Sequence, residues 1–370
     1  MSARYSACGA AMLLLALMSM LLPGAGAVGE ANVAITTPAG EFTPQTPVTV
    51  EVGVSKTVAD IVEDLKMDQF TAAREHYEGS VTLKSLAQGT GLSGPTFTQA
   101  REFYNNNADF NHRYLMEEAF VATGGNAEVA EMVEKTVMDA VPVQAILSYA
   151  YAGRNGDRAS WDKACALYIG QPDLTSAPYE RAQKRAANFG TLSGEVALAN
   201  VAAVEACASG PSEANYMVLQ KVIKIIYAQA SIRYAHLLDI DFREGLSTVD
   251  HRAEGQAFYR IIAPMVDAAS PSCHAVMNEL YVPHASCRMQ PCPPLRQCAG
   301  IKLPCQLFAA YRYSFDQEPD TNKKYYCEAL ACIPDALDLT SSDLGTLENT
   351  EVWAIVLCNP QLPPKHGSCV

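Results

Sequence analysis

The sequence lacks the signatures of the most familiar catalytic sites. It contains no H-E-x-x-H, G-x-S-x-G or G-x-x-x-x-G-K-[ST] motif, so zinc proteases, serine hydrolases and P-loop NTPases find no support. A G-x-G-x-x-G string is present at Gly89–Gly94, but no strand is predicted before it, and we interpret it as a loop. These absences predict a protein that is not an enzyme.

Tryptophan, glycosylation sequons and closely paired cysteines are also scarce or absent. The chain has two tryptophans against 17 tyrosines, and the phenol groups can serve either as packing surface or as oxygen ligands. No N-x-[ST] sequon occurs, so N-glycans are not expected. Because there is no C-x-x-C pair, the cysteines predict disulfides rather than a zinc site.

The cysteines are unevenly distributed along the chain. Of the 12, Cys8 belongs to residues 1–27, which are expected to be removed as a signal peptide, and this leaves 12 − 1 = 11. Of these 11, Cys165 and Cys207 alone precede residue 270. The odd total leaves one thiol free or pairing between chains. Cys165 and Cys207 are expected to be either joined to each other or reduced. The remaining cysteines should pair mainly among themselves as a clasp over the helical body: Cys273, Cys287, Cys292, Cys298, Cys305, Cys327, Cys332, Cys358 and Cys369.

Residues 1–27 have the features of a secretory signal peptide. Arg4 is their one basic residue, an apolar run extends from Ala10 to Leu22, and small residues at 25–27 fit a cleavage site. The run is too short to span a bilayer, and no second apolar segment follows it. We therefore expect a secreted protein of the periplasmic space or cell surface, without a membrane span.

The chain is acidic, with 27 Lys and Arg against 40 Asp and Glu. Removal of residues 1–27 deletes one base and no acid, so the mature charge is 26 − 40 = −14. Such a surface repels nucleic acid, which is not expected as a partner, and is compatible with cations. The same acidity also keeps a secreted protein in solution.

Hydrophobic periodicity predicts a mainly α-helical fold. Residues 28–56 are expected to form an extended Thr- and Pro-rich leader with an edge strand at Val48–Val54. Residues 57–270 should form a helical domain with an irregular internal repeat, and residues 271–370 a disulfide-rich section packed on it. Helices are expected at 57–78, 95–123 with a break at 105–107, 127–151 with a kink at Pro142, 157–170, 176–190, from 211 past Leu237, 250–269, 274–281 and near Asp343.

The internal repeat consists of an aromatic residue, an alanine and a tyrosine at i, i+3 and i+7. It occurs at Phe70-Ala73-Tyr77, Phe97-Ala100-Tyr104 and Trp161-Ala164-Tyr168, and the spacing places each trio on one helix face. The pattern indicates either a duplicated helical hairpin or a packing motif in which alanine allows close helix approach. A glycine follows Tyr77, Tyr151 and Tyr168 after two positions, and we expect all three just past a helix end with left-handed backbone: Gly79, Gly153 and Gly170.

Hard donor groups are concentrated in the helical domain. Phenolate, carboxylate and imidazole together suit Fe(III), because anionic oxygen neutralises its charge, and an arginine can hold a bridging carbonate. Any one of these residues taken singly also fits a surface carboxylate or a packed tyrosine. The predicted iron ligands are the phenols of Tyr77, Tyr168, Tyr234 and Tyr259, the carboxylates of Asp162, Asp239 and Glu254, and the imidazole of His112 or His236.

Four segments resemble a family of algal iron proteins. They are Trp161–Gly170 (WDKACALYIG), Ile226–Asp239 (IYAQASIRYAHLLD), His251–Val266 (HRAEGQAFYRIIAPMV) and Cys273–Tyr281 (CHAVMNELY). The sequence is similar there to the low-iron-inducible periplasmic, or Fe-assimilating, proteins related to phytotransferrins. The resemblance spans residues 55–310 and departs at the Cys- and Pro-rich stretch 287–305.

The resemblance implies an extracellular iron-binding protein that takes part in high-affinity iron uptake when iron is scarce, without catalytic turnover. Iron would be its ligand, and a cell-surface ferroxidase, permease or receptor its partner. Two other interpretations stay open. The first is a structural or partner-binding protein of the cell wall or matrix without metal, and the second is a secreted enzyme of an unidentified class.

Overall fold

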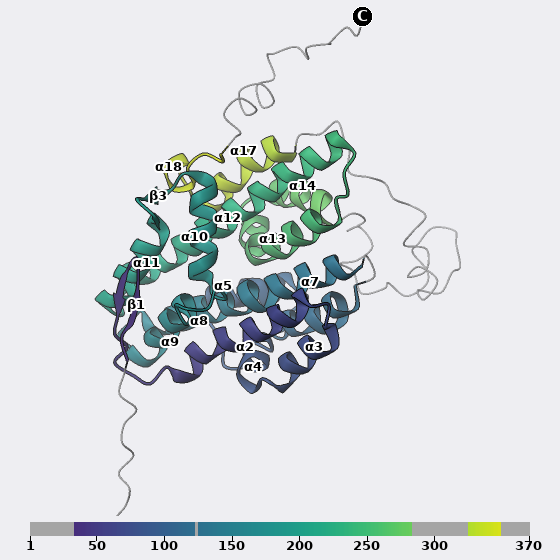
Figure 1. Ribbon diagram of the computed structural model, residues 1–370. Helices are drawn as coiled ribbons and strands as arrows, with labels where there is room; N and C mark the ends of the chain where they lie inside the picture. The colour runs from purple at the N-terminus through teal and green to yellow at the C-terminus, as the bar shows by residue number, and fades with distance from the viewer. Residues whose placement is uncertain (1–32, 123–124, 283–324, 349–370) are drawn as a thin grey trace, which may run out of the picture.

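The computed structural model describes residues 33–122, 125–282 and 325–348, and their regular structure is almost entirely helical. The mainly α-helical fold expected from the sequence is therefore confirmed. Figure 1 shows the early helices in one half of the molecule and the helices from α12 onward in the other. Residues 1–27 and Cys287, Cys292, Cys298, Cys305, Cys358 and Cys369 lie outside the described residues.

The N-terminal segment is a short hairpin followed directly by a helix. Strands β1 (Ile35–Thr37) and β2 (Gly40–Phe42) pair antiparallel, and helix α2 (Thr49–Lys66) begins seven residues after β2. The predicted edge strand at Val48–Val54 is wrong. Its alternating valines imitate a strand, but the apolar face continues at helical spacing and is buried along its length: Val54, Val58, Ile61 and Leu65.

The first predicted helix is interrupted. Instead of one helix over 57–78, α2 ends at Lys66 and α3 (Phe70–Gly79) begins after a turn in which Asp68 has φ 58°. Such left-handed backbone ends a right-handed helix. Helix α4 (Val81–Ala87) was not predicted. The next helices follow in the expected places: α5 (Pro95–Phe103) and α6 (Phe110–Arg113), the last continuing as turns η2 (Tyr114–Glu118) and η3 (Ala119–Val121).

The helix expected to kink at Pro142 contains a π-helical turn at that place. Helix α7 (Asn126–Lys135) passes into the π-turn η4 (Thr136–Ala140), and α8 (Val141–Gly153) follows with Pro142 in its first turn. Proline lacks the N–H that a continuous helix needs, so a widened turn before it accommodates the lost hydrogen bond. The π-turn faces the protein interior, because all five of its residues are buried.

Three further helices carry the chain to the other half of the molecule. Asp157 caps α9 (Arg158–Ile169) by accepting a hydrogen bond from the Ser160 N–H, as predicted. Helices α10 (Pro178–Phe189) and α11 (Leu198–Ser209) follow, separated by the small hairpin of β3 (Leu192–Ser193) and β4 (Val196–Ala197). The sequence did not predict α11, whose Ala-rich segment has apolar residues on every side.

Helix α12 (Glu213–Glu244) is the longest of the described helices, and α11, α13 (Val249–Ala269) and α17 (Tyr325–Leu337) pack against it. It ends at Gly245, which has left-handed backbone, and α13 returns antiparallel against it. Helices α14 (Pro271–Tyr281), α17 and α18 (Ser341–Leu344) complete the second half of the molecule, as Figure 1 shows. In the described ranges, no helix has both the length and the apolar composition that crossing a membrane requires.

Two disulfides join helices that are distant in sequence. Cys273–Cys332 connects α14 to α17 with Cα atoms 5.6 Å apart, which confirms pairing among the cysteines after residue 270 for this pair. Cys165–Cys207 connects α9 to α11, so the first of the two expected outcomes for these residues holds.

The three glycines of the repeat behave differently from one another. Gly170 has φ 67° just past α9, as predicted. Gly79 and Gly153 are instead the last residues of right-handed helices, so the left-handed backbone predicted for them is wrong. Gly153 is required for another reason, since a Cβ there would lie 2.9 Å from the Trp161 backbone nitrogen. The repeated alanines are all buried at helix contacts, which favours the packing interpretation: Ala73, Ala100 and Ala164.

Candidate functional site

Tyr234 and Glu254 meet across the antiparallel pair α12 and α13. The Tyr234 phenol, 4% exposed, lies next to the Glu254 carboxylate. Burial and the nearby Glu254 charge raise the pKa of Tyr234 to about 12. Burial would also raise the pKa of Glu254, but attraction to Lys135 and the neighbouring Tyr234 hydroxyl outweigh it, so this pKa lies below its usual range. A carboxylate is thus held ionised beside a neutral phenol.

Lys135 is the cation on which the buried carboxylates converge. Its side chain comes from the last turn of α7 and is 5% exposed. Its Nζ lies 2.7 Å from a Glu131 oxygen, 2.7 Å from Glu134 and 3.1 Å from Glu254. Burial would lower the pKa of Lys135, but attraction to Glu254 and Glu134 raises it instead. Burial raises the pKa of Glu131 to about 7, against the attraction of Lys135.

A second buried ion pair lies beside this group. Asp139, fully buried in the π-turn η4, accepts hydrogen bonds from Arg181 Nε at 3.1 Å and from Arg181 Nη2 at 2.9 Å. The Tyr227 hydroxyl donates to the same carboxylate at 2.9 Å. A π-turn widens the helix and re-aims a side chain, and here it presents Asp139 to α10 and α12.

Arg185 differs from these charges because its guanidinium lacks a protein acceptor. It follows Arg181 by one turn of α10, is 6% exposed, and its Cζ lies 5.9 Å from the Tyr234 ring centroid. Among the described residues, its Nε and Nη1 find no hydrogen-bond partner. Burial lowers the pKa of Arg185 to about 10. A guanidinium is a planar donor suited to carbonate, carboxylate or phosphate.

We call these residues the central charged cluster. It lies between α7, η4, α10, α12 and α13 and contains four carboxylates against three cations, 4 − 3 = 1 excess negative charge when all are ionised. Two of the predicted iron ligands, Tyr234 and Glu254, belong to it. Its members are Glu131, Glu134, Lys135, Asp139, Arg181, Arg185, Tyr227, Tyr234 and Glu254.

His251 and Asp241 form a hydrogen-bonded pair next to the cluster. His251 Nδ1 lies 2.7 Å from an Asp241 carboxylate oxygen, and the His251 ring centroid is 6.1 Å from that of Tyr234. Asp241 is two helical turns beyond Tyr234 on α12, while His251 is one turn before Glu254 on α13. Carboxylate, imidazole and phenol groups therefore extend along the interface between α12 and α13.

Tyr77 and His112, both predicted ligands, are brought together elsewhere. The Tyr77 hydroxyl lies 2.7 Å from His112 Nδ1, and the two rings stack at 5.9 Å. Burial, with a smaller contribution from Glu78, raises the pKa of the Tyr77 phenol above its usual value. The phenol therefore stays protonated, and the His112 tautomer sets which of the two groups donates the hydrogen bond.

Tyr259 and Tyr168 each have a partner of their own. The Tyr259 hydroxyl lies 2.9 Å from His274 Nδ1, and burial raises the pKa of this phenol. Tyr168, fully buried on α9, donates to the Asn200 side-chain oxygen at 2.7 Å, and burial raises its pKa as well. Both phenols are satisfied within the fold, away from Tyr234.

The remaining predicted ligands hold segments of the chain in place. Fully buried Asp162 accepts from the backbone N–H groups of Gln45 and Thr46 at 2.7 and 2.8 Å. Asp239 accepts from the first backbone N–H groups of α17 at 3.2 and 2.8 Å, and burial raises its pKa to about 6 despite those bonds. His236 packs edge-on against the ring of Tyr326 on α17.

The nine predicted ligands therefore do not meet at one point. The structure joins Tyr234 to Glu254 and Tyr77 to His112, and it places the other five at separate positions. Across the described ranges, no group of three or more His, Cys, Asp or Glu side chains is arranged to hold a metal ion. A metal site built from the described residues would therefore need phenol ligands or a bound anion as well.

Sequence reasoning missed the cations of the cluster, Lys135, Arg181 and Arg185. Only phenols, carboxylates and imidazoles were predicted as ligands, and basic residues on amphipathic helices normally face solvent. A signal was nevertheless available for two of them: Arg181 and Arg185 occupy i and i+4 on the same face as Ala182 and Phe189, which are buried. The π-turn that buries Asp139 leaves no comparable pattern.

Comparison with protein-family models, with curated proteins and with solved structures finds no significant match to this chain.

Proposed function

We propose that the protein binds Fe(III) at the central charged cluster, with Tyr234 and Glu254 as ligands and carbonate held by Arg185, and that it acts in iron acquisition outside the cell. One observation carries the proposal: a buried phenol lies next to an ionised carboxylate, beside a buried guanidinium with unfilled donors. Those are the three chemical elements of an anion-assisted ferric site. The resemblance of residues 226–266 to Fe-assimilating proteins supports the same assignment.

The residues of the cluster divide the work of binding. Glu254 is already ionised, whereas Tyr234 has to lose its proton before it can act as an oxygen ligand. Lys135 is paired with Glu254 in this structure. If Glu254 binds a metal instead, Lys135 still has Glu131 and Glu134 as partners. Arg185 supplies the positive charge that holds an anion. Iron is cargo in this proposal, and no catalytic turnover is involved.

The test is a titration of iron-free protein with ferric nitrilotriacetate, with and without bicarbonate. Ferric phenolate absorbs visible light, so a band should appear and strengthen with bicarbonate. Because metal binding displaces the Tyr234 proton, iron retention should fall steeply as the pH is lowered. Tyr234→Phe should abolish the band and Arg185→Gln its bicarbonate dependence.

Tyr168→Phe is the matched control, because that buried phenol is bonded to an amide rather than to a carboxylate. It should leave the band unchanged. A colourless titration, or an equal band in Tyr234→Phe, contradicts the proposal.

A structural or partner-binding role without metal is the second candidate. The observation that favours it is that each predicted ligand already has a partner inside the fold, as with Asp162, Asp239 and Tyr168. This scaffold role becomes the better account if metal analysis of protein purified without chelator finds no iron.

A further inference from the structure

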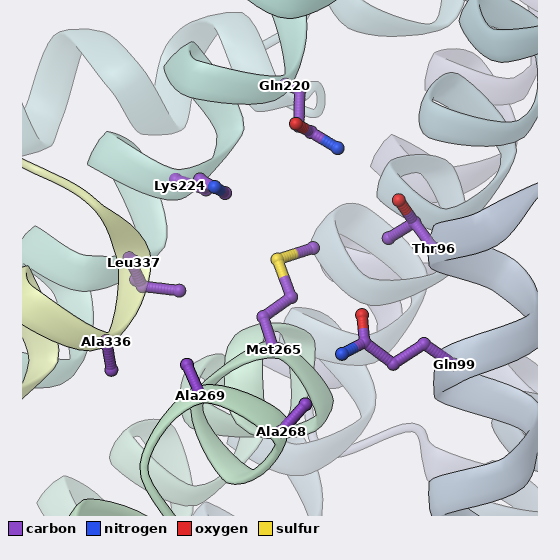
Figure 2. A pocket seen from close by; sticks show the side chains of 9 residues that line it. All are labelled: Thr96, Gln99, Gln220, Lys224, Met265, Ala268, Ala269, Ala336 and Leu337. Carbon is purple, nitrogen blue, oxygen red and sulfur yellow. The ribbon is translucent and has the colours of Figure 1, made fainter.

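A hollow of about 300 Å³ opens between α5, α12, α13 and α17, apart from the central charged cluster. Figure 2 shows the side chains of Gln99, Gln220, Lys224 and Met265 arranged around it, with Met265 extending into its middle from α13. Its apolar walls are aliphatic: Met265, Ala268, Ala269, Ala336 and Leu337. A volume of this size is at the lower end of the range for small-molecule pockets.

A second hollow of about 270 Å³ shares Gln220, Lys224 and Leu337 with the first. It adds the apolar side chains of Met217 and Val218 on α12, and the charged side chains of Lys221 and Asp338. The two hollows therefore meet at Lys224 and provide an elongated surface with aliphatic sides.

Lys224 is the unusual charge of this surface. Burial lowers its pKa, against attraction to Asp338, which lines the second hollow with it. Among the described residues, no carboxylate lies within ion-pair distance of its Nζ. By contrast, Lys135 has three carboxylates around it, and Lys221, one turn earlier on α12, lies 2.8 Å from Asp343.

The polar groups beside Lys224 are also arranged to receive a ligand. The Gln220 amide nitrogen donates to the Tyr216 hydroxyl at 3.2 Å, which fixes that side chain at the rim of the hollow. Gln99 makes no side-chain hydrogen bond within the described part of the chain, so its amide is available.

We infer that this groove binds an alkyl carboxylate, with the carboxylate on Lys224 and the alkyl chain along Met265, Leu337 and the alanines. Charge complementarity selects an anion, because no carboxylate of the described residues lies within ion-pair distance of the half-buried ammonium. The lining contains no aromatic ring, which favours a flexible aliphatic chain over a planar one. Methionine adapts its shape to such chains.

The experiment is calorimetric titration of the full chain with octanoate, with 1-octanol as the uncharged probe of equal chain length. Octanoate should bind saturably, and octanol at least roughly tenfold more weakly, since a charge-assisted hydrogen bond contributes about 1.5–3 kcal/mol. Lys224→Gln should weaken octanoate binding by a similar factor. Equal binding of octanol, no binding of octanoate, or unchanged binding by Lys224→Gln overturns the inference.

Lys56→Gln is the control, because this exposed lysine of α2 is paired with Asp60 and lines neither hollow. It should bind octanoate as the unaltered protein does, and a loss equal to that of Lys224→Gln would show a general charge effect and overturn the site. Lys224 precedes Tyr234 by ten residues, about 15 Å along α12. The ferric band should therefore be the same in Lys224→Gln, so iron binding and carboxylate binding fail or succeed separately.

Discussion

The Tyr234 phenol lies next to a carboxylate 20 residues further along the chain, that of Glu254. The short turn between α12 and α13 makes this contact possible, because it folds the second helix back along the first. Both residues lie in segments that resemble algal iron proteins. Their contact, with Lys135 next to Glu254 and Arg185 next to Tyr234, brings two of the predicted ligands together at one place.

Lys135 should be essential for stability. Lys135→Met leaves Glu131, Glu134 and Glu254 without their shared cation, and breaking such a buried pair costs about 3–5 kcal/mol. Urea unfolding followed by circular dichroism measures the change. Lys56→Met is the control, because Lys56 pairs with Asp60 at an exposed site where an ion pair contributes about 0–1 kcal/mol. Similar losses for the two variants would mean that the buried cluster is not organised by Lys135.

Glu131 should make stability depend on pH near neutrality. Its pKa of about 7 in the folded protein is above the unfolded value of about 4.3, so the folded state retains the proton over this interval. The contribution of this group to the free energy of unfolding is therefore greatest below pH 4 and declines as the pH rises to 7.

Glu131→Gln removes that titration. Its stability relative to the unaltered protein should rise between pH 5 and pH 8, by on the order of 2 kcal/mol, and urea midpoints at the two pH values measure it. Glu63→Gln serves as a control, since that residue is exposed on α2. A constant difference across the pH range would show that Glu131 titrates normally.

Gly153 and Gly79 should respond oppositely to alanine. A Cβ at Gly153 would lie 2.9 Å from the Trp161 backbone nitrogen, so Gly153→Ala forces α8 and α9 apart and should cost about 1–3 kcal/mol. Nothing lies within 4 Å of a Cβ at Gly79, where alanine should stabilise by up to about 1 kcal/mol. Thermal unfolding compares the two, and equal effects would show that the helix contact at Trp161 is not tight.

Much of the helical architecture could be predicted because its stop signals are local. Asp157, Gly170 and Gly190 delimit α9 and α10 as their residue types indicate, and the apolar stripe after Pro211 is the buried face of α12. The strand predicted at Val48–Val54 failed because alternation over seven residues is outweighed by the helical period of the next ten. Helix α11 was missed because its Ala-rich segment has apolar residues on every side and so shows little helical period.

The site could be predicted in chemistry but not in arrangement. Tyr234 and Glu254 were chosen as donor types, and their contact follows from how α13 returns along α12. Asp162 and Asp239 were chosen for the same reason, yet each accepts backbone hydrogen bonds from a segment more than 80 residues away. No local sequence pattern distinguishes a carboxylate that binds a metal from one that caps a distant segment.

Asp162 provides the clearest separation between those two roles. Its carboxylate accepts from the backbone of Gln45 and Thr46, from the Thr46 hydroxyl at 2.9 Å and from Arg158 Nε at 2.8 Å, so it fixes the chain ahead of α2. Asp162→Asn places an amide N–H₂ group against these donors and removes the charge from a fully buried position. We expect a loss of about 2–4 kcal/mol in urea unfolding and faster proteolysis between β2 and α2.

The ferric band of Asp162→Asn should nevertheless stay unchanged, because Asp162 lies outside the central charged cluster. Asp157→Asn is the control on the same helix: asparagine caps a helix as well as aspartate does, so its stability should be unaltered. If Asp162→Asn loses the band while its folded population is intact, this carboxylate is an iron ligand, and the site has to be placed at α9 rather than between α12 and α13.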